Sequence, residues 1–346
     1  MKSYRLLDWK AGGQFEDIPD PEPGPGEVRI RMGGTGICHS DIHLMHDWTP
    51  ETMPAVAQMT PPFTLGHENA GWIDALGSGV QGWEVGEPVV ISATWGCGYC
   101  DHCRIGFDNY CETWALNGCG LGEDGGLAAY MVCPAKQLIR LDTLHPKDAA
   151  PLTDAGLTSY HAVKHTRPWL TPNTAALIIG VGGLGHMGLA YLREIFGGTI
   201  IAVDNDDGAR KLAAERGADI VLESNDDTAA AIRDATKGLG VRAAFDFVGI
   251  QPTMELAAAV TRSRGRIVLV GLGGGYLPVG FGSMAFDTSV VMPLGGSTPE
   301  LAEVVALAES GRVIPHTTEF AFDQLEEAYE KLHHGQIEGR GVILPT

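Results

Sequence analysis

The second half of this 346-residue sequence alternates short apolar segments with alanine-rich, amphipathic ones. The apolar segments are TAALIIG (174–180), IIAVD (200–204), DIVLE (219–223), AAFDFVG (243–249) and GRIVLVG (265–271). Segments with helical periodicity lie between them, namely GARKLAAERGA, AAAIRDAT and MELAAAVTRS. Parallel strands need long crossover connections, so this alternation predicts an α/β fold with a doubly wound parallel sheet covered by helices.

The turn after the first of these strands is rich in glycine. It has G-x-G-x-x-G spacing in the run Gly180, Val181, Gly182, Gly183, Leu184 and Gly185. Glycine at these positions lets the backbone turn tightly and approach a pyrophosphate at the start of a helix. Asp204 ends the next predicted strand, where a carboxylate accepts hydrogen bonds from an adenosine ribose and repels a 2'-phosphate. We therefore predict NAD rather than NADP, although the nearby Arg210 is compatible with NADP and Asp204 alone can be a solvated acid.

Four cysteines lie close together in the run CGYCDHCRIGFDNYC, at positions 97, 100, 103 and 111. Four thiolates at this spacing can surround one zinc ion, and such a closed shell is structural. The chain begins MKSYRLLDWK without an apolar signal segment and has an odd number of cysteines, seven, which disfavours a disulfide framework. A ferredoxin cluster needs a shorter last gap followed by proline. We predict that Cys97, Cys100, Cys103 and Cys111 bind structural zinc and that Cys119 and Cys133 are buried apolar residues.

Composition narrows the class of protein further. The net charge of -19 repels nucleic-acid phosphates and anionic lipid surfaces, so we expect neither nucleic acid nor membrane as a partner. No apolar run is long enough to span a bilayer, and the expected location is the cytoplasm. The length suggests two domains. Residues 1–155 contain short alternating runs such as EVRIRM and EPVVISA, which are typical of an antiparallel sheet with long loops.

Taken together, the motifs resemble those of the zinc-containing medium-chain alcohol dehydrogenases. The resemblance runs along the whole chain, through GPGEVRIR, GICHSDIH, GHENAGWIDALGSGV, the cysteine run, GVGGLGHMG and GRGVIL. The segments PLTDAGLTSYHA and GGGYLPVGF are most similar to bacterial secondary-alcohol dehydrogenases and carbonyl reductases. The resemblance implies a GroES-like catalytic domain with two zinc sites (1–155), a Rossmann NAD-binding domain (156–295), a return to the catalytic domain (296–346) and an active-site cleft between the domains.

Cys38 and His67 lie in separate glycine-rich turns and are candidate ligands of a second, catalytic metal. The resemblance assigns them this role and makes Asp154 the third ligand, in a stretch where the liver-type enzymes have cysteine. Three protein ligands leave zinc an open fourth position. By the same resemblance, Asp41 orients the ligands, and Glu68 is either a transient ligand or a neighbouring carboxylate.

The resemblance also assigns a proton relay and several cofactor contacts. Ser40 takes the proton of the alcohol and His43 passes it on through the cofactor ribose, while zinc lowers the pKa of the alcohol hydroxyl. Contacts with the cofactor are expected from His39 at a phosphate, Thr158 at the nicotinamide, Val248 and Val270 at strand ends, and Arg340 at the pyrophosphate.

Substrate choice is the least constrained feature. Trp48, Trp95 and Leu294 are candidates for a large apolar pocket, or else simple core residues. The resemblance favours secondary alcohols and ketones, including aryl ones, and a homotetramer, with a dimer as the alternative. Two other functions remain open: a polyol or formaldehyde-type zinc dehydrogenase, and a non-catalytic dinucleotide-binding protein similar to the crystallin relatives.

Overall fold

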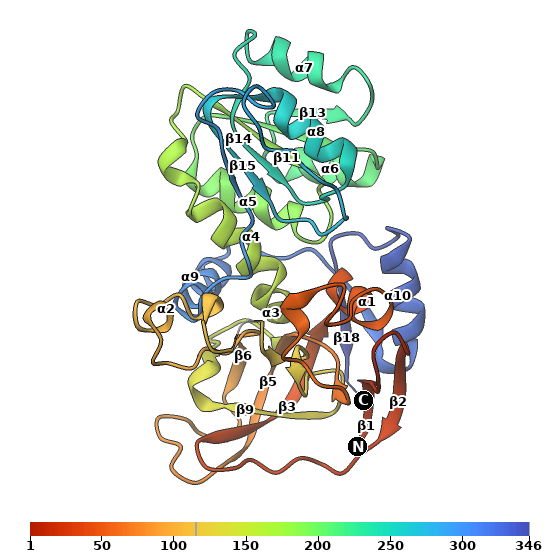
Figure 1. Cartoon of the computed structure of the whole chain (residues 1–346). Coiled ribbons are helices and arrows are strands. Elements are labelled where there is room, and N and C mark those ends of the chain that lie inside the picture. The colour runs from red at the N-terminus through yellow and green to blue at the C-terminus, as the bar shows by residue number, and fades with distance from the viewer. Residues whose placement is uncertain (115, 346) are drawn as a thin grey trace. The chain divides into compact units, whose positions relative to one another are not determined.

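The computed structural model describes residues 1–114 and 116–345, and the chain forms two compact units. The first unit comprises Met1–Leu157 and Gly295–Thr346, and the second comprises Thr158–Leu294 (Figure 1). The helices are α1 (His39–His46), α2 (Asp101–Arg104), α3 (Pro146–Ala149), α4 (Ala155–Lys164), α5 (Gly185–Ile195), α6 (Asp207–Glu215), α7 (Thr228–Ala235), α8 (Gln251–Val260), α9 (Thr298–Glu309) and α10 (Leu325–His333).

The second unit is built on a parallel sheet. Its strand order is β13-β12-β11-β14-β15-β16, with bounds Ile220–Glu223, Thr199–Asp204, Ala175–Ile179, Val241–Asp246, Thr261–Leu269 and Ser289–Val291. Every neighbouring pair is parallel. The central strand β11 is buried at all of its positions because helices cover both faces of such a sheet. The strands predicted at 200–204 and 219–223 agree with β12 and β13 to within a residue, and the strand predicted at 243–249 overlaps β14, which ends at Asp246.

The first unit contains mainly antiparallel strands. Its largest sheet has the order β10-β6-β5-β3-β18-β17, with bounds Leu138–Arg140, Pro88–Ile91, Glu68–Leu76, Glu27–Gly36, Arg340–Leu344 and Thr317–Ala321, and β9 (Tyr130–Pro134) also pairs with β3. A second sheet has the order β2-β1-β4 (Gly13–Asp17, Lys2–Leu6, Phe63–Thr64), and β7 (Gly118–Cys119) pairs with β8 (Gly122–Glu123). In β3 the apolar side chains of Val28, Ile30 and Met32 are buried, as the alternating sequence predicts.

The last fifty residues contain two elements that we did not predict from the sequence. The strand β17 pairs in parallel with β18, and the helix α10 lies between them in the chain. Leu325, Ala328, Tyr329 and Leu332 of α10 are buried and join the core around β1 and α1. Their spacing is the i, i+3, i+4, i+7 pattern of an amphipathic helix, so the signal for α10 was present.

None of the helices within the described part of the chain combines the length and the apolar character needed to cross a membrane.

Candidate functional site

Three potential metal ligands from separate segments meet inside the first unit. Cys38 precedes α1, His67 precedes β5 and Asp154 precedes α4. One ligand atom from each lies within 4.8 Å of the others, and His67 Nε2 is 3.6 Å from Asp154 Oδ2. Zinc binds nitrogen and oxygen at about 2.0–2.2 Å in tetrahedral geometry, which separates two such ligands by about 3.4 Å. The thiol, imidazole and carboxylate therefore fit as three of the four ligands of one zinc ion.

Asp41 holds two of these segments together. Its side chain is completely buried, and Oδ2 accepts a hydrogen bond of 2.9 Å from the backbone N–H of Cys38 at the start of α1. Its Oδ1 lies 3.1 Å from His67 Nδ1. Because a carboxylate can only accept, this contact places the imidazole proton on Nδ1 and leaves Nε2 free to bind metal.

The site is strongly negative around His67. Burial by itself lowers the pKa of His67, but Asp41, Asp154 and Cys38 together outweigh burial and raise the pKa well above its usual value. A low-dielectric pocket with two carboxylates and a thiol favours a cation in this position. The surroundings of His67 therefore fit a divalent metal ion as well as the donor geometry does.

Glu68 and Arg340 form a buried ion pair next to the ligand Asp154. Arg340 Nε donates to both carboxylate oxygens of Glu68 at 3.0 Å, and Arg340 Nη2 donates to Asp154 Oδ2 at 3.2 Å. Burial raises the pKa of Glu68 to about 7, against the opposing effect of the Arg340 charge. This arrangement places Glu68 beside the three ligands, in contact with Arg340. It also engages two guanidinium nitrogens, so the predicted contact between Arg340 and a pyrophosphate depends on Nη1.

A glycine makes room for this ion pair. A Cβ atom added at Gly36, on β3, would lie 1.8 Å from Glu68 Oε2. Such a distance is far below van der Waals contact, so no other residue fits here without displacing Glu68. The close approach of β3 and β5, which pair at Gly36 and Glu68, thus positions the carboxylate beside Asp154.

The proposed relay residues lie at the start of α1. Ser40 Oγ is 3.6 Å from Cys38 Sγ, and the Ser40 side chain is half-buried. His43 Nδ1 lies 2.7 Å from Asp47 Oδ2, and its ring stacks on that of Trp48 with a centroid distance of 5.0 Å. His39 is exposed at the first position of α1. The geometry places Ser40 next to the metal ligands, while the roles of His39, Ser40 and His43 remain predictions.

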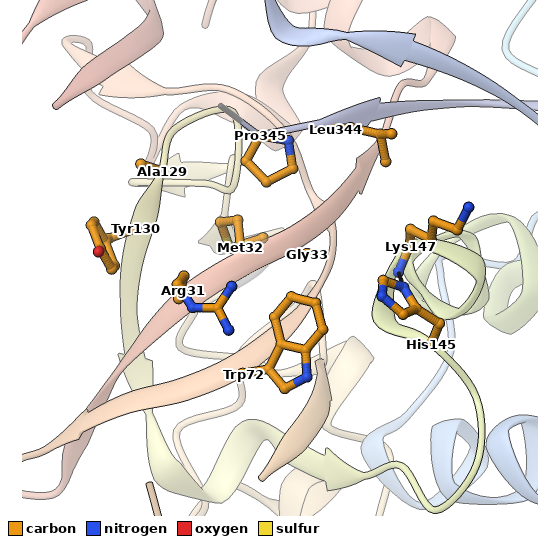
Figure 2. Close-up of a pocket in the computed structure, with 10 residues that line it drawn as sticks. All are labelled: Arg31, Met32, Gly33, Trp72, Ala129, Tyr130, His145, Lys147, Leu344 and Pro345. Carbon is orange, nitrogen blue, oxygen red and sulfur yellow. Dashed lines mark hydrogen bonds between the residues drawn. The ribbon is translucent and has the colours of Figure 1, made fainter. Parts of the chain in front are cut away.

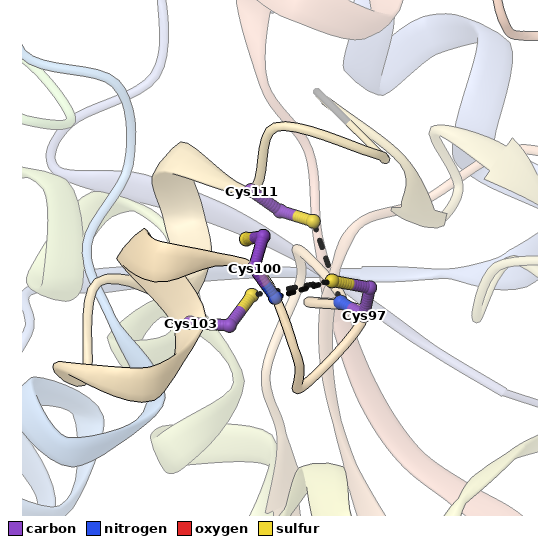
Figure 3. Close-up of side chains that lie close together, drawn as sticks. All are labelled: Cys97, Cys100, Cys103 and Cys111. Carbon is purple, nitrogen blue, oxygen red and sulfur yellow. Dashed lines mark hydrogen bonds between the residues drawn. The ribbon is translucent and has the colours of Figure 1, made fainter.

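The four cysteines of the second predicted metal site come together in a small lobe around α2. Their sulfur atoms all lie within 4.8 Å of one another, and the Cys97 and Cys103 sulfurs are 3.9 Å apart (Figure 3). Zinc–sulfur bonds of about 2.3 Å put the sulfurs of a tetrahedral shell about 3.8 Å apart. The backbone N–H of Cys100 donates to the Cys97 sulfur, and those of Cys97 and Trp114 donate to the Cys111 sulfur. These bonds orient the thiolates, and the lobe fits one structural zinc ion.

The remaining two cysteines differ from the four in the lobe. Cys119 and Cys133 are completely buried, and burial raises the pKa of Cys119 to about 11. Both are packed in the core of the largest sheet of the first unit. Their surroundings therefore match the expectation of inert, apolar thiols.

In the second unit, the glycine-rich turn lies between β11 and α5. Gly180 has φ +82°, and a Cβ on Gly185 would lie 1.8 Å from the Gly180 carbonyl oxygen. A Cβ on Gly182, by contrast, would have no atom within 4 Å. Gly180 and Gly185 are thus needed for the turn itself, while the space over Gly182 is open to a ligand, as a pyrophosphate site requires.

Two side chains that we did not single out from the sequence stabilise this turn. His186 Nδ1 lies 2.9 Å from the carbonyl oxygen of Gly182, and the Ser159 hydroxyl donates to the carbonyl of Leu184 at 2.8 Å. Ser159 follows Thr158, which is buried at the start of the second unit. A single histidine or serine carries no sequence signal for such a contact, because the contact depends on how α4 and the turn pack.

Asp204 closes β12 beside the same turn. Its Oδ2 accepts the backbone N–H of Val181 at 2.7 Å, and its Oδ1 accepts that of Asp206 at 2.9 Å. Arg210 donates to the Asp204 carbonyl and also pairs with Asp207. The Asp204 carboxylate is therefore fixed at the glycine-rich turn, where an adenosine ribose is expected. The Arg210 guanidinium is bound to the backbone of the same residue.

The predicted pocket residues have different surroundings. Trp95 is 8% exposed, donates its indole N–H to the Ser92 carbonyl and belongs to the core of the largest sheet. Trp48 is half-buried against the core that contains α10, and Leu294 is half-buried at the end of the second unit. Val248, two residues beyond β14, is half-buried, and Val270, directly after β15, is 9% exposed. A role of these five residues in binding substrate or cofactor remains a prediction.

A surface pocket of about 320 Å³ lies elsewhere in the first unit (Figure 2). The Arg31 guanidinium lies 4.4 Å from the Trp72 ring, and Lys147 pairs with Glu319 at 2.6 Å. The lining residues are Arg31, Met32, Gly33, Trp72, Ala129, Tyr130, His145, Lys147, Leu344 and Pro345. The pocket contains none of the predicted metal, cofactor or relay residues, so it is distinct from the candidate site.

Comparison with known proteins adds independent information. Residues 24–143 match the family described as "Alcohol dehydrogenase GroES-like domain", and residues 183–310 match the family described as "Zinc-binding dehydrogenase". The D-arabinose 1-dehydrogenase (NADP(+)) of Saccharolobus solfataricus is 35% identical over 340 residues, which cover 96% of this chain and 94% of that protein.

Solved structures match over the same extent. The alcohol dehydrogenase of the archaeon Aeropyrum pernix has a TM-score of 0.92 at 35% identity, covering 100% of both chains. The acetophenone reductase of Geotrichum candidum, solved in complex with NAD, has a TM-score of 0.87 at 31% identity, covering 99% of this chain and 96% of that one. The predicted fold class, a GroES-like β-rich part plus a doubly wound parallel sheet, is confirmed.

Proposed function

This chain belongs to the zinc-containing medium-chain alcohol dehydrogenase family, and from that premise we propose that it oxidises secondary alcohols, and some primary ones, reversibly with NAD. The products are ketones or aldehydes. The observation that carries this proposal is the convergence of Cys38, His67 and Asp154 within 4.8 Å. A non-catalytic dinucleotide-binding protein has no need of such a ligand set.

The residues of the chain have distinct tasks in this reaction. Bound zinc supplies a Lewis acid that lowers the pKa of the substrate hydroxyl, and bound NAD supplies the hydride acceptor. Asp41 fixes the tautomer of His67, and Arg340 restrains the ligand carboxylate of Asp154. Ser40, whose hydroxyl lies 3.6 Å from the Cys38 sulfur, takes the alcohol proton, and His43 returns it to solvent.

The proposal includes two zinc ions per chain and NAD as the preferred cofactor. The lobe of Cys97, Cys100, Cys103 and Cys111 holds the second zinc, in a closed shell with no position for substrate. The S. solfataricus relative is named as an NADP enzyme, whereas the G. candidum enzyme was solved with NAD. Asp204 supports NAD here, because its carboxylate lies at the turn where the ribose is expected.

Replacing Asp204 with serine tests the cofactor preference. Removing a carboxylate that repels the 2'-phosphate is expected to raise the ratio of kcat/KM for NADP to that for NAD by about tenfold or more. The measurement is steady-state kinetics with both cofactors at saturating alcohol. Glu223→Gln is the matched control, because Glu223 ends the adjacent strand β13 and pairs with Asp204 in the sheet register. A wild-type enzyme that already prefers NADP at least about fivefold would contradict the assignment.

Bulky and aryl ketones are the proposed substrates in the reductive direction. The acetophenone reductase of G. candidum, an enzyme named for an aryl ketone, supports this choice. Trp48 in the first unit and Leu294 at the end of the second unit are half-buried, and each is an apolar side chain of a kind that suits an aryl group. Trp95 packs in the core of the first unit and donates its indole N–H to the Ser92 carbonyl, so its role in substrate binding stays a prediction.

A panel of alcohols and ketones with NAD and NADP tests the proposed function. We expect turnover of secondary and aryl alcohols, followed by nicotinamide absorbance, and loss of that turnover after chelation. The zinc content of the untreated protein is expected to be two ions per chain. Zinc at two per chain without turnover of any alcohol or ketone would contradict the dehydrogenase assignment.

A polyol dehydrogenase is the second candidate function. The S. solfataricus relative acts, by its name, on D-arabinose, and it matches 96% of this chain. Aldoses and polyols are included in the same panel because bound zinc would lower the pKa of any hydroxyl group that coordinates it. A kcat/KM for D-arabinose above that for every simple secondary alcohol would favour this alternative.

We also propose a homo-oligomer, with a tetramer preferred over a dimer. The strand β16 forms an open edge of the parallel sheet in the second unit, and large apolar side chains are exposed in and around the preceding segment. They are Leu272, Tyr276, Val279, Phe281, Phe286 and Met292, with Phe281 completely exposed. Open edges and apolar patches of this kind are usually covered by a partner, here a second copy of the chain. Sedimentation equilibrium measures the state, and a monomer at micromolar concentration would contradict it.

A further inference from the structure

The second unit contains a buried carboxylate that the reaction described above does not use. Asp246 is the last residue of β14 and is completely buried. β14 lies between β11 and β15 in the parallel sheet. Ligands of open α/β sheets bind beyond the carboxyl ends of the strands, and Asp246 stands at that edge.

Asp246 forms hydrogen bonds with the backbone just beyond β14 and just beyond β15. Its Oδ1 accepts hydrogen bonds of 2.9 Å from the backbone N–H groups of Val248 and Gly249. Its backbone carbonyl accepts the N–H of Val270 at 2.8 Å and that of Gly271 at 3.0 Å. Val248 and Val270, the two residues expected to face the cofactor, are therefore both hydrogen-bonded to Asp246.

Val248 is tightly packed against two glycines. A Cβ on Gly180, in the glycine-rich turn, would lie 2.4 Å from Val248 Cγ2, and a Cβ on Gly271 would lie 2.2 Å from the Val248 carbonyl carbon. Gly273 also donates its N–H to the Val248 carbonyl at 3.1 Å. A shift of Val248 would therefore disturb the turn after β11 and the turn after β15 together.

The buried carboxyl is costly to keep in this place. Burial raises the pKa of Asp246, and the two backbone N–H groups that it accepts counteract that effect. An apolar residue of similar size would avoid the burial cost but would leave the Val248 and Gly249 N–H groups without this partner. The group is thus suited to holding a particular backbone shape beyond β14.

We propose that Asp246 is a positioning residue for the dinucleotide, whose carboxylate orders the backbone at Val248 and Gly249 into the shape that binds it. The inference rests on the proposed function, because it takes NAD as the ligand of this sheet edge. The carboxylate acts through Val248 and Gly249, without touching the cofactor. The hydrogen bonds to Val270 and Gly271 come from the backbone carbonyl, which any residue at this position would supply.

The test is NADH binding to the Asp246→Ala enzyme, measured by titration of nicotinamide fluorescence. Loss of two hydrogen bonds to the loop is expected to weaken NADH binding about tenfold or more, with zinc content unchanged. Asp219→Ala is the matched control. Asp219 Oδ2 accepts the backbone N–H of Ile200 at 2.7 Å. Asp219 directly precedes β13, so it lies at the amino end of the sheet, away from the expected cofactor site. Thermal unfolding of both variants reports the purely structural effect.

A second pair of variants decides the question if Asp246→Ala does not fold. Asp246→Asn keeps an acceptor oxygen in place and is expected to retain NADH affinity within about threefold, whereas Asp246→Glu displaces the carboxylate by a methylene and is expected to weaken NADH about tenfold. Equal NADH affinity of Asp246→Asn and Asp246→Glu would overturn the proposal. A lower melting temperature of Asp246→Ala with unchanged NADH affinity would overturn it as well. A wild-type protein that binds neither NADH nor NADPH would instead refute the proposed function.

Discussion

Replacing His67 with alanine is expected to lower alcohol oxidation at least about a thousandfold and to remove one of two zinc ions per chain. The imidazole is buried between Asp41 and Asp154, and its Nε2 is one of three ligand atoms within 4.8 Å. Without it, a carboxylate and a thiol remain, which is one ligand fewer than catalytic zinc sites use. Turnover is measured by nicotinamide absorbance, and zinc is measured on the same sample.

The control for this variant is a histidine near the other metal site. His102→Ala removes a side chain that is 45% exposed in the cysteine lobe and lies 3.6 Å from Glu112. It is expected to retain two zinc ions and wild-type turnover because His102 is outside both ligand sets. If His67→Ala keeps both zinc ions and full activity, the metal lies elsewhere and the assignment of the first site is wrong.

Replacing Ser40 with alanine is expected to lower kcat about a hundredfold, which is a typical contribution of one acid–base group. Ser40 Oγ is 3.6 Å from the Cys38 sulfur, so a substrate oxygen bound at the metal would come within reach of the hydroxyl. Zinc content and NADH affinity are expected to stay at wild-type levels, since alanine fits where serine does. The measurement is kcat at saturating alcohol and NAD.

Ser40→Thr separates the hydroxyl from the loss of volume. Threonine retains a hydroxyl group at the same position, so this variant is expected to recover most of the activity that alanine loses. Wild-type kcat in Ser40→Ala would remove Ser40 from the relay. Equal losses in Ser40→Ala and Ser40→Thr would mean that α1 needs serine for its packing and not for proton transfer.

The sequence predicted the sheet of the second unit well, because its signals are local. Strands such as β12 and β14 are apolar runs bounded by a glycine or a charged residue, and the glycine-rich turn has a fixed spacing. The cysteine lobe was equally predictable, since four thiolates within fifteen residues can surround a metal without knowledge of the rest of the fold.

What the sequence missed depends on contacts between distant segments. The ion pair of Arg340 with Glu68, 272 residues away in the chain, had no signal in the sequence, and the expected contact of Arg340 with a pyrophosphate stays a prediction. Asp246 ends an ordinary apolar strand, and nothing in its neighbours signals that it binds two N–H groups of the following loop. Such contacts follow from strand pairing and burial, which are set by the whole chain.

All seven expected zinc ligands belong to one of the two compact units. Cys38, His67, Asp154 and the four cysteines of the lobe precede Thr158, where the other unit begins. We therefore expect zinc binding not to depend on NAD, so that zinc content can be measured on protein without bound NAD. Chelator and nucleotide titrations can for that reason be run as separate experiments on a single preparation, each with its own baseline.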